Sequence, residues 1–208
     1  MKVYARYFSQ NGLNLRTNTI LQFGESFDII GAAVLINPGS AKPLNKPLYQ
    51  EQLHLLSSIT GKFDHWQEFS IDSTMRHLEK IFDNSYIEKK KMLNGIILLF
   101  NLFNLREQHL DNALKLKDNC NCTELFTTDK DLALMQNISK IYLGWGNTGK
   151  DETLRPYSQR IFDAVKNSQS FYINPLFEMN KFYHPGYVNR SYKQNSNTIN
   201  ILKNFSSK

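Results

Sequence analysis

The chain has 208 residues and a formal charge of +6, with 41% hydrophobic, 21% charged and 12% aromatic residues. These values exclude a chain that is disordered throughout, and they favour one globular domain, residues 1–208. The apolar runs are far shorter than the ~20 residues that span a bilayer, and the N-terminus lacks the pattern of a secretory signal. We therefore expect a cytoplasmic protein with no membrane segment.

The first elements expected along the chain are the two strands of an N-terminal β-hairpin within residues 1–24. Both segments alternate and are rich in Thr, Tyr and Phe, and they flank Asn11-Gly12, a dipeptide typical of two-residue hairpin turns. Residues 28–36 are then apolar almost throughout and end at Asn37-Pro38-Gly39. Continuous apolarity indicates a strand that is covered on both faces, as in a parallel sheet.

Helices and strands are expected to alternate over the rest of the chain. Helical patterns cover residues 47–59, 72–92 (with Asp72 as N-cap), 107–117, 129–137, 152–167 and 190–206. Short apolar strands cover residues 95–100, 140–144 and 170–173. This order predicts a three-layer α/β/α sandwich with a mostly parallel four-stranded central sheet and the hairpin at its N-terminus.

In such a sheet, ligands bind beyond the carboxyl ends of the strands. The side chains expected there include Asn37, Asn101, Trp145 and His184. The sequence has no Ser-centred elbow, no phosphate loop and no metal-ligand spacing, so we expect no cofactor and no metal. The two cysteines, Cys120 and Cys122, have one residue between them, a poor spacing for a disulfide, and we interpret them as reduced thiols in a loop.

Base excision is a reaction that these amide and imidazole groups could perform. Cleavage of an N-glycosidic bond makes the departing base anionic, and a donor at a base oxygen lowers that barrier. An Asn amide holds a donor and an acceptor side by side, and can pair with the edge of a pyrimidine.

Four segments, in chain order, resemble motifs of the uracil-DNA glycosylase superfamily. Asn37-Pro38-Gly39 resembles the first motif, and Asn101 is similar to the Asn that reads the pyrimidine. Residues 142–146, Tyr-Leu-Gly-Trp-Gly, resemble a Leu-Leu-Trp-Gly strand, and His184-Pro185-Gly186 is similar to a His-Pro-Ser motif.

The resemblance implies a uracil-DNA glycosylase-like fold and hydrolysis of the N-glycosidic bond of a flipped-out base in DNA, uracil or a related deaminated base. It implies two catalytic residues: Asn37 to orient the attacking water, and His184 to stabilise the leaving base. The base-binding residues that it implies are Pro38, Gly39, Asn101 and Trp145. It implies no organic cofactor and no metal.

The C-terminal segment, residues 179–208, contains five basic residues, no acidic residue and several aromatic side chains. Phosphates attract Lys and Arg, and nucleobases stack on aromatic rings, so this composition suits nucleic acid. We expect Lys181, Arg190 and Lys193 to contact the DNA backbone. The alternative is a helix with a solvated basic face.

A second resemblance is to a bacterial family of uncharacterised function. It covers Asn37–Ala41, Asp72–Arg76, Asn101–Arg106 and Trp145-Gly146. This resemblance adds Asp72 and Arg76 as a candidate second site, either as an ion pair or as a phosphate-binding pair. Two other functions therefore stay open: a non-catalytic module that binds a nucleotide or single-stranded nucleic acid, and a hydrolase of a free nucleoside or a small phosphorylated ligand.

Overall fold

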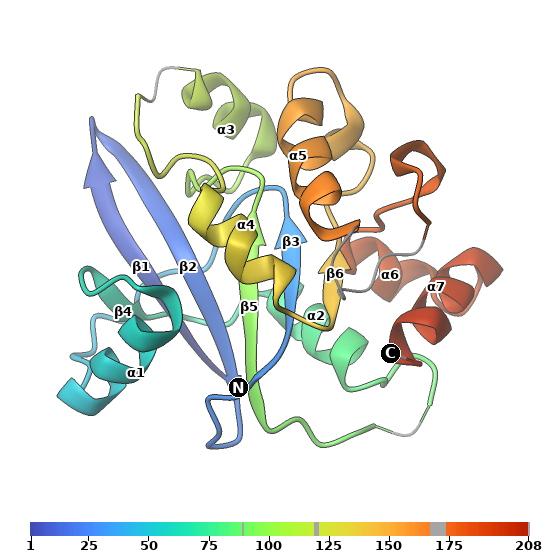
Figure 1. The fold of residues 1–208 in the computed structure, drawn as a ribbon, viewed down its shortest axis with the longest axis horizontal. Coiled ribbons are helices and arrows are strands. Elements are labelled where there is room, and N and C mark those ends of the chain that lie inside the picture. The colour runs from blue at the N-terminus through green and yellow to red at the C-terminus, as the bar shows by residue number, and fades with distance from the viewer. Residues whose placement is uncertain (89, 119–120, 167–173, 208) are drawn as a thin grey trace.

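A computed structural model describes residues 1–88, 90–118, 121–166 and 174–207 of the chain. Its centre is a six-stranded mixed sheet with the strand order β4-β1-β2-β5-β3-β6 (Figure 1). The strands are β1 (Lys2–Gln10), β2 (Leu13–Phe23), β3 (Ile29–Leu35), β4 (Trp66–Glu68), β5 (Gly95–Asn101) and β6 (Ile141–Leu143).

The N-terminal hairpin is confirmed, with β1 and β2 antiparallel on either side of Asn11-Gly12. The two turn residues have φ values of 53° and 76°, the left-handed conformation that a type I′ hairpin turn requires. The hairpin is part of the central sheet, however, because β2 pairs antiparallel with β5 and β1 pairs antiparallel with β4. The predicted four-stranded, mostly parallel sheet is therefore wrong.

The reason is that β2 is a central strand. Its neighbouring residues Ile20 and Leu21 are both fully buried although they point to opposite faces. The Thr-rich alternation of the hairpin hides this two-sided burial. Strand β4 has only three residues, too few to leave a pattern in the sequence.

The second half of the sheet is parallel, as predicted. Strand β3 pairs with β5 on one side and with β6 on the other, both in parallel register. The strand predicted at residues 170–173 lies outside the described residues.

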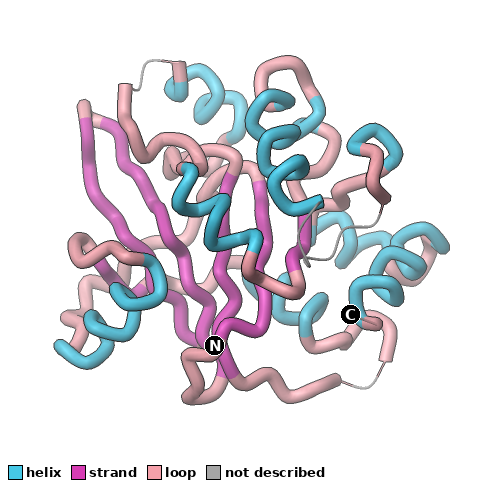
Figure 2. Tube along the Cα trace, viewed as in Figure 1, coloured by secondary structure: helices cyan, strands magenta, loops and turns pink. Residues whose placement is uncertain are grey.

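Helices cover both faces of the sheet, which confirms the α/β class (Figure 2). On one face, Val34 and Leu98 pack in a core to which α1, α4 and α5 contribute. On the other face, Leu35 and Leu99 pack in a core with residues of α2, α6 and α7. The helices are α1 (Gln50–Thr60), α2 (Ser73–Phe82), α3 (Leu110–Lys117), α4 (Asp129–Gln136), α5 (Arg155–Lys166), α6 (Pro185–Ser191) and α7 (Ser196–Ser206), with 3₁₀ turns η1 (Thr148–Lys150) and η2 (Phe177–Met179).

Two helices differ from their predicted lengths. Asp72 caps α2 as predicted, since its carboxylate accepts from the Met75 N–H at 2.9 Å, but the helix ends at Phe82 and does not continue to residue 92. Asn84 has a left-handed φ of 64°, which no α-helix contains. The single helix predicted over residues 190–206 is two helices, α6 and α7, and a new N-cap at Asn195 starts the second.

Two further findings concern the sequence expectations. Across the described parts of the chain, no helix combines the length and the apolar character that crossing a bilayer requires. Cys122 is disulfide-bonded, which contradicts the expected reduced thiol, and Cys120 lies outside the described residues.

Candidate functional site

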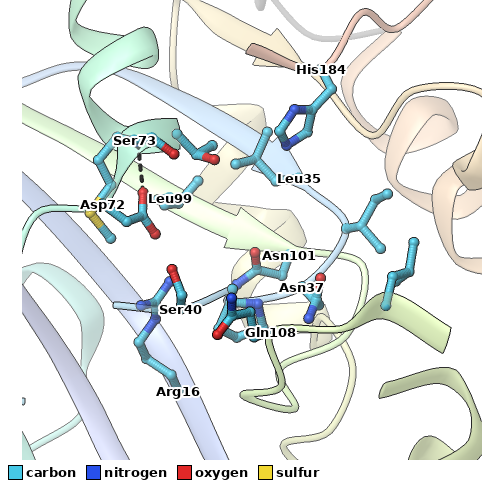
Figure 3. A pocket seen from close by; sticks show the side chains of 16 residues that line it. Arg16, Leu35, Asn37, Ser40, Asp72, Ser73, Leu99, Asn101, Gln108 and His184 are labelled. Carbon is cyan, nitrogen blue, oxygen red and sulfur yellow. Dashed lines mark hydrogen bonds between the residues drawn. The ribbon is translucent and has the colours of Figure 1, made fainter. Parts of the chain in front are cut away.

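A cleft of about 300 Å³ opens beyond the carboxyl ends of β3 and β5, on the face covered by α2 and α6 (Figure 3). This volume is at the lower end of the range of roughly 300–1,000 Å³ for small-molecule pockets. The cleft brings together six predicted site residues from four separate segments: Asn37, Pro38, Gly39, Asp72, Asn101 and His184.

The alternation of the strands explains why the two Asn side chains meet. Leu35 and Leu99 face the α2 layer, and the residues two positions further along, Asn37 and Asn101, follow on the same side. The N–H of Leu102 donates to the Leu35 carbonyl at 2.8 Å, which holds the two strand ends together. Gly39, with a left-handed φ of 60°, then turns the chain away beside the Asp72 carboxylate.

The amide of Asn37 is held in one orientation. Its Nδ2 donates to the main-chain carbonyl of Glu107 at 2.8 Å. One of the two Nδ2 hydrogens is therefore engaged, which fixes the amide, and Oδ1 is left to accept a hydrogen bond from a molecule in the cleft.

Asn101 is 3% exposed, and its Oδ1 is buried with no hydrogen-bond partner among the described residues. The main chain at this position is fixed, because the Thr127 hydroxyl donates to the Asn101 carbonyl at 2.7 Å. An unsatisfied buried acceptor costs about 1–3 kcal/mol, and a ligand that donates an N–H would recover it.

His184 is the N-cap of α6, and its Nδ1 accepts from the Gly186 N–H at 3.1 Å. In the neutral ring this bond assigns the proton to Nε2, which is then a donor. Burial lowers the pKa of His184 below its usual 6.5, and the charges of His77 and Arg190 lower it further, against an opposing effect of Asp72. The ring is therefore neutral at pH 7.

Trp145 does not line the cleft. Its side chain is fully buried and packs against Phe182, with ring centroids 4.6 Å apart. The neighbouring Gly146 N–H donates to the Phe182 carbonyl at 2.6 Å, and the Tyr142 hydroxyl donates to the Tyr183 carbonyl. The structure thus makes Trp145 part of the support that positions the segment before His184.

The three basic residues predicted to contact DNA are exposed and lie on or near the C-terminal helices. Arg190, on α6, lies near enough to His184 to lower its pKa. Lys181 lies near Lys150, whose pKa it lowers, and the ammonium of Lys193 lies 5.8 Å from the centre of the Tyr192 ring.

Asp72 and Arg76 are one turn apart at the start of α2, but only Asp72 belongs to the cleft. Asp72 lines the cleft, whereas Arg76 is exposed on α2 and is not among the cleft residues. The two side chains, both within the described part of the chain, form no ion pair, and Oδ1 of Asp72 instead caps α2. The predicted ion pair is therefore wrong.

Arg16, on β2, is a cleft residue that the sequence did not indicate. Arg16 is 1% exposed, and its Nε and Nη1 have no hydrogen-bond partner among the described residues. Burial lowers its pKa to about 10, with Asp72 acting against this and Arg106 adding to it. The guanidinium is therefore charged at neutral pH.

A β-bulge brings Arg16 to this face. The pairing of β1 with β2 shifts by one residue between Tyr4–Ile20 and Arg6–Thr17, where Asn18 has a left-handed φ of 49°. In the part of β2 that precedes Asn18, the odd-numbered and even-numbered side chains therefore lie on the faces opposite to those they occupy after it. A regular strand would have placed Arg16 with Ile20 on the opposite face, and no residue type in this stretch signals the bulge.

The chain matches no family model, no curated protein and no solved structure. Within the ranges that the structure describes, no group of three or more His, Cys, Asp or Glu side chains could hold a metal ion.

Proposed function

We propose that this protein is a glycosylase-like enzyme that hydrolyses the N-glycosidic bond of a flipped-out base in DNA, uracil or a related deaminated base. The observation that carries the proposal is the convergence of Asn37, Asn101 and His184 on one cleft at the ends of two parallel strands. All three come from the segments that resemble the glycosylase superfamily.

Recognition of the base is assigned to Asn101. Its unpartnered Oδ1 accepts from the N3–H of uracil, and its Nδ2 donates to O4. A cytosine presents a lone pair at N3 and an amino group at the next position, so both contacts would be lost. The buried amide thus favours a deaminated base over the normal one.

Stabilisation of the leaving base is assigned to His184. As the bond between N1 of the base and C1′ of the sugar breaks, negative charge develops on the base, and Nε2–H donates to its O2. Removal of one such donor typically reduces the rate by about 10²–10³. The neutral imidazole is suitably arranged for this role, because the Gly186 N–H occupies Nδ1 and leaves the ring proton on Nε2.

Positioning of the nucleophile is assigned to Asn37. Its Oδ1 accepts a hydrogen bond from a water molecule and directs the water oxygen at C1′. The new C1′–O bond replaces the C1′–N1 bond, the water loses a proton to solvent, and the base anion takes one up. Water is the only co-reactant.

The test is incubation with oligonucleotides that contain uracil, hypoxanthine or a mismatch, in single and double strands, followed by alkaline cleavage at abasic sites. We expect cleavage by the wild type at one of these bases, and a large loss in Asn37→Ala. Arg76→Met, which changes an exposed residue outside the cleft, is the matched control and should cleave as the wild type does.

Two results would contradict the proposed function. If the wild type binds these oligonucleotides but leaves no abasic site, the proposal fails, and the cleft belongs to a non-catalytic binding module. Cleavage that survives in Asn37→Ala at the wild-type rate would also contradict the assigned role of this residue.

A further inference from the structure

A buried cation lies in the wall of the cleft without a counterion in contact. Arg16 is 1% exposed and makes no ion pair within the described residues, although two of its nitrogen atoms are buried and unpartnered. A buried charge is normally paired, because removing it from water costs several kcal/mol. The unpaired state of Arg16 therefore calls for an explanation.

The neighbours of Arg16 do not neutralise it. The Asp72 carboxylate is the acid that acts on it electrostatically, but no ion pair joins the two side chains, and Oδ1 of Asp72 caps α2. The guanidinium of Arg106 adds positive charge, and it donates to the Ala41 carbonyl at 2.9 Å. The Phe69 ring, 5.5 Å from the guanidinium carbon, covers Arg16 without taking its hydrogen bonds.

The same cleft also receives the N-terminus of α2, a helix of ten residues. Ser73 and Thr74, in its first turn, line the cleft together with Ser40. The positive end of a helix and a guanidinium both favour an oxyanion, and hydroxyl groups supply further donors.

We infer that Arg16 binds a phosphate group of the substrate, so that the cleft recognises a nucleotide unit rather than a base alone. Phosphate binding at Arg16 is inferred from the geometry of the cleft. That the phosphate belongs to a nucleotide rests on the proposed function. The phosphate belongs either to a DNA strand or to a free nucleotide, and the experiment separates the two.

The first measurement is thermal unfolding with and without inorganic phosphate, at constant ionic strength. We expect phosphate to raise the Tm of the wild type and to leave that of Arg16→Met unchanged. Without phosphate, Arg16→Met should unfold at a higher temperature than the wild type, because an apolar side chain of similar length replaces an unpaired buried charge. Arg76→Met should respond to phosphate as the wild type does.

Two results would overturn the inference: an equal response to phosphate in wild type and Arg16→Met, or a lower Tm of Arg16→Met together with no response of the wild type. A second variant, Arg16→Lys, keeps the inference testable if Arg16→Met does not fold. It keeps the charge but not the planar fork, and should show a weakened response to phosphate.

The second measurement is the affinity for deoxyuridine, deoxyuridine monophosphate and a short single strand containing uracil. Loss of a hydrogen bond to a charged group weakens binding by about tenfold or more. We expect the monophosphate or the strand to bind the wild type at least about tenfold more tightly than the nucleoside, and the better of the two identifies the source. Arg16→Met should lose this preference.

The failures are distinguishable. If the nucleoside binds as tightly as both phosphorylated ligands, the phosphate site is overturned while base excision stands on its own test. If inorganic phosphate binds through Arg16 but no uracil compound does and no base is released, the phosphate site stands and the proposed function fails.

Discussion

Two buried arginines on the same hairpin have opposite surroundings. Arg6 is 2% exposed, and its guanidinium bonds to Asp64 at 2.7 Å, to Glu124 and to the Thr17 hydroxyl at 3.2 Å. Arg16 is 1% exposed and has no such partner among the described residues. Arg6 is held by the protein itself, whereas Arg16 is free to bind a molecule that enters from outside.

The bulge at Asn18 creates this difference. It turns the side chain of Arg16 toward the α2 face, while Arg6 contacts residues of the other face. The comparison teaches that burial of an arginine does not by itself define its role. A buried arginine whose N–H groups all have partners in the protein supports the fold, whereas one with unpartnered N–H groups is a candidate for binding a ligand.

The largest effect is expected for a substitution in the cleft that contains Arg16, and it concerns the rate of base release. His184→Ala should reduce the rate of base release by about 10²–10³, because the donor to the developing anion is lost. Its stability to urea should fall only by the loss of the α6 cap, about 1 kcal/mol. Single-turnover kinetics and urea unfolding measure the two quantities, and a loss of rate no larger than the loss of folded protein would contradict the role.

Arg6→Met should lower the free energy of unfolding and leave the activity of the folded protein unchanged. Removing this guanidinium takes one of two cations from Glu124, which keeps Lys62 at 3.2 Å, and leaves the exposed Asp64 to solvent. We therefore expect unfolding to become easier by about 2 kcal/mol, the usual cost of losing hydrogen bonds to a charged group. The folded fraction should keep its activity. Urea unfolding at pH 7 checks the prediction, and a stability equal to that of Arg16→Met would remove the distinction between the two arginines.

Asn101→Leu tests whether a second buried polar group of the cleft, like Arg16, serves a ligand and not the stability of the fold. The change replaces a buried acceptor that lacks a partner by an apolar group of similar size, so we expect a gain of about 1 kcal/mol in the free energy of unfolding. Base release should be lost in the same variant. Calorimetry combined with the cleavage assay tests both, and a destabilised variant would mean that the amide has an unseen partner.

The pH dependence follows from the lowered pKa of His184. The unfolded chain takes up this proton near pH 6.5, before the folded protein does, so stability is complete above that pH and falls as the pH drops below it. Protonation of Nδ1 removes the acceptor that the Gly186 N–H uses to orient the ring, so activity should fall with the neutral fraction, by less than about twofold between pH 7.5 and 6.5. An NMR titration of His184, with His77→Gln to remove the neighbouring imidazole, checks the assignment; a midpoint above 6.5 would contradict it.

Arg190→Met should have the smallest effect. If this exposed arginine contacts a phosphate, its removal lowers the slope of log K against log salt concentration by about one. Binding isotherms at three salt concentrations measure the slope. An unchanged slope would indicate a solvated basic face at this helix.

The positions of Asn37 and Asn101 could be predicted from the sequence, because each follows a long apolar strand, which is a local signal. His184 was identified by its motif alone, since the strand predicted before it lies outside the described residues. Arg16 could not, since one residue in a left-handed conformation reverses the faces of β2. The antiparallel half of the sheet was also missed, because the pairing of β2 with β5 joins segments that are distant in the chain. Trp145 was predicted in the cleft, but its contacts with Phe182 could only be seen in three dimensions.

The most direct test of the cleft as a base-excision site is to quantify free base by chromatography after incubation with a single strand that contains one uracil. The account predicts free uracil and abasic strand in equal amounts from the wild type, and neither from a variant that carries both Asn37→Ala and His184→Ala. A strand that is bound by the wild type yet retains all of its uracil would contradict it.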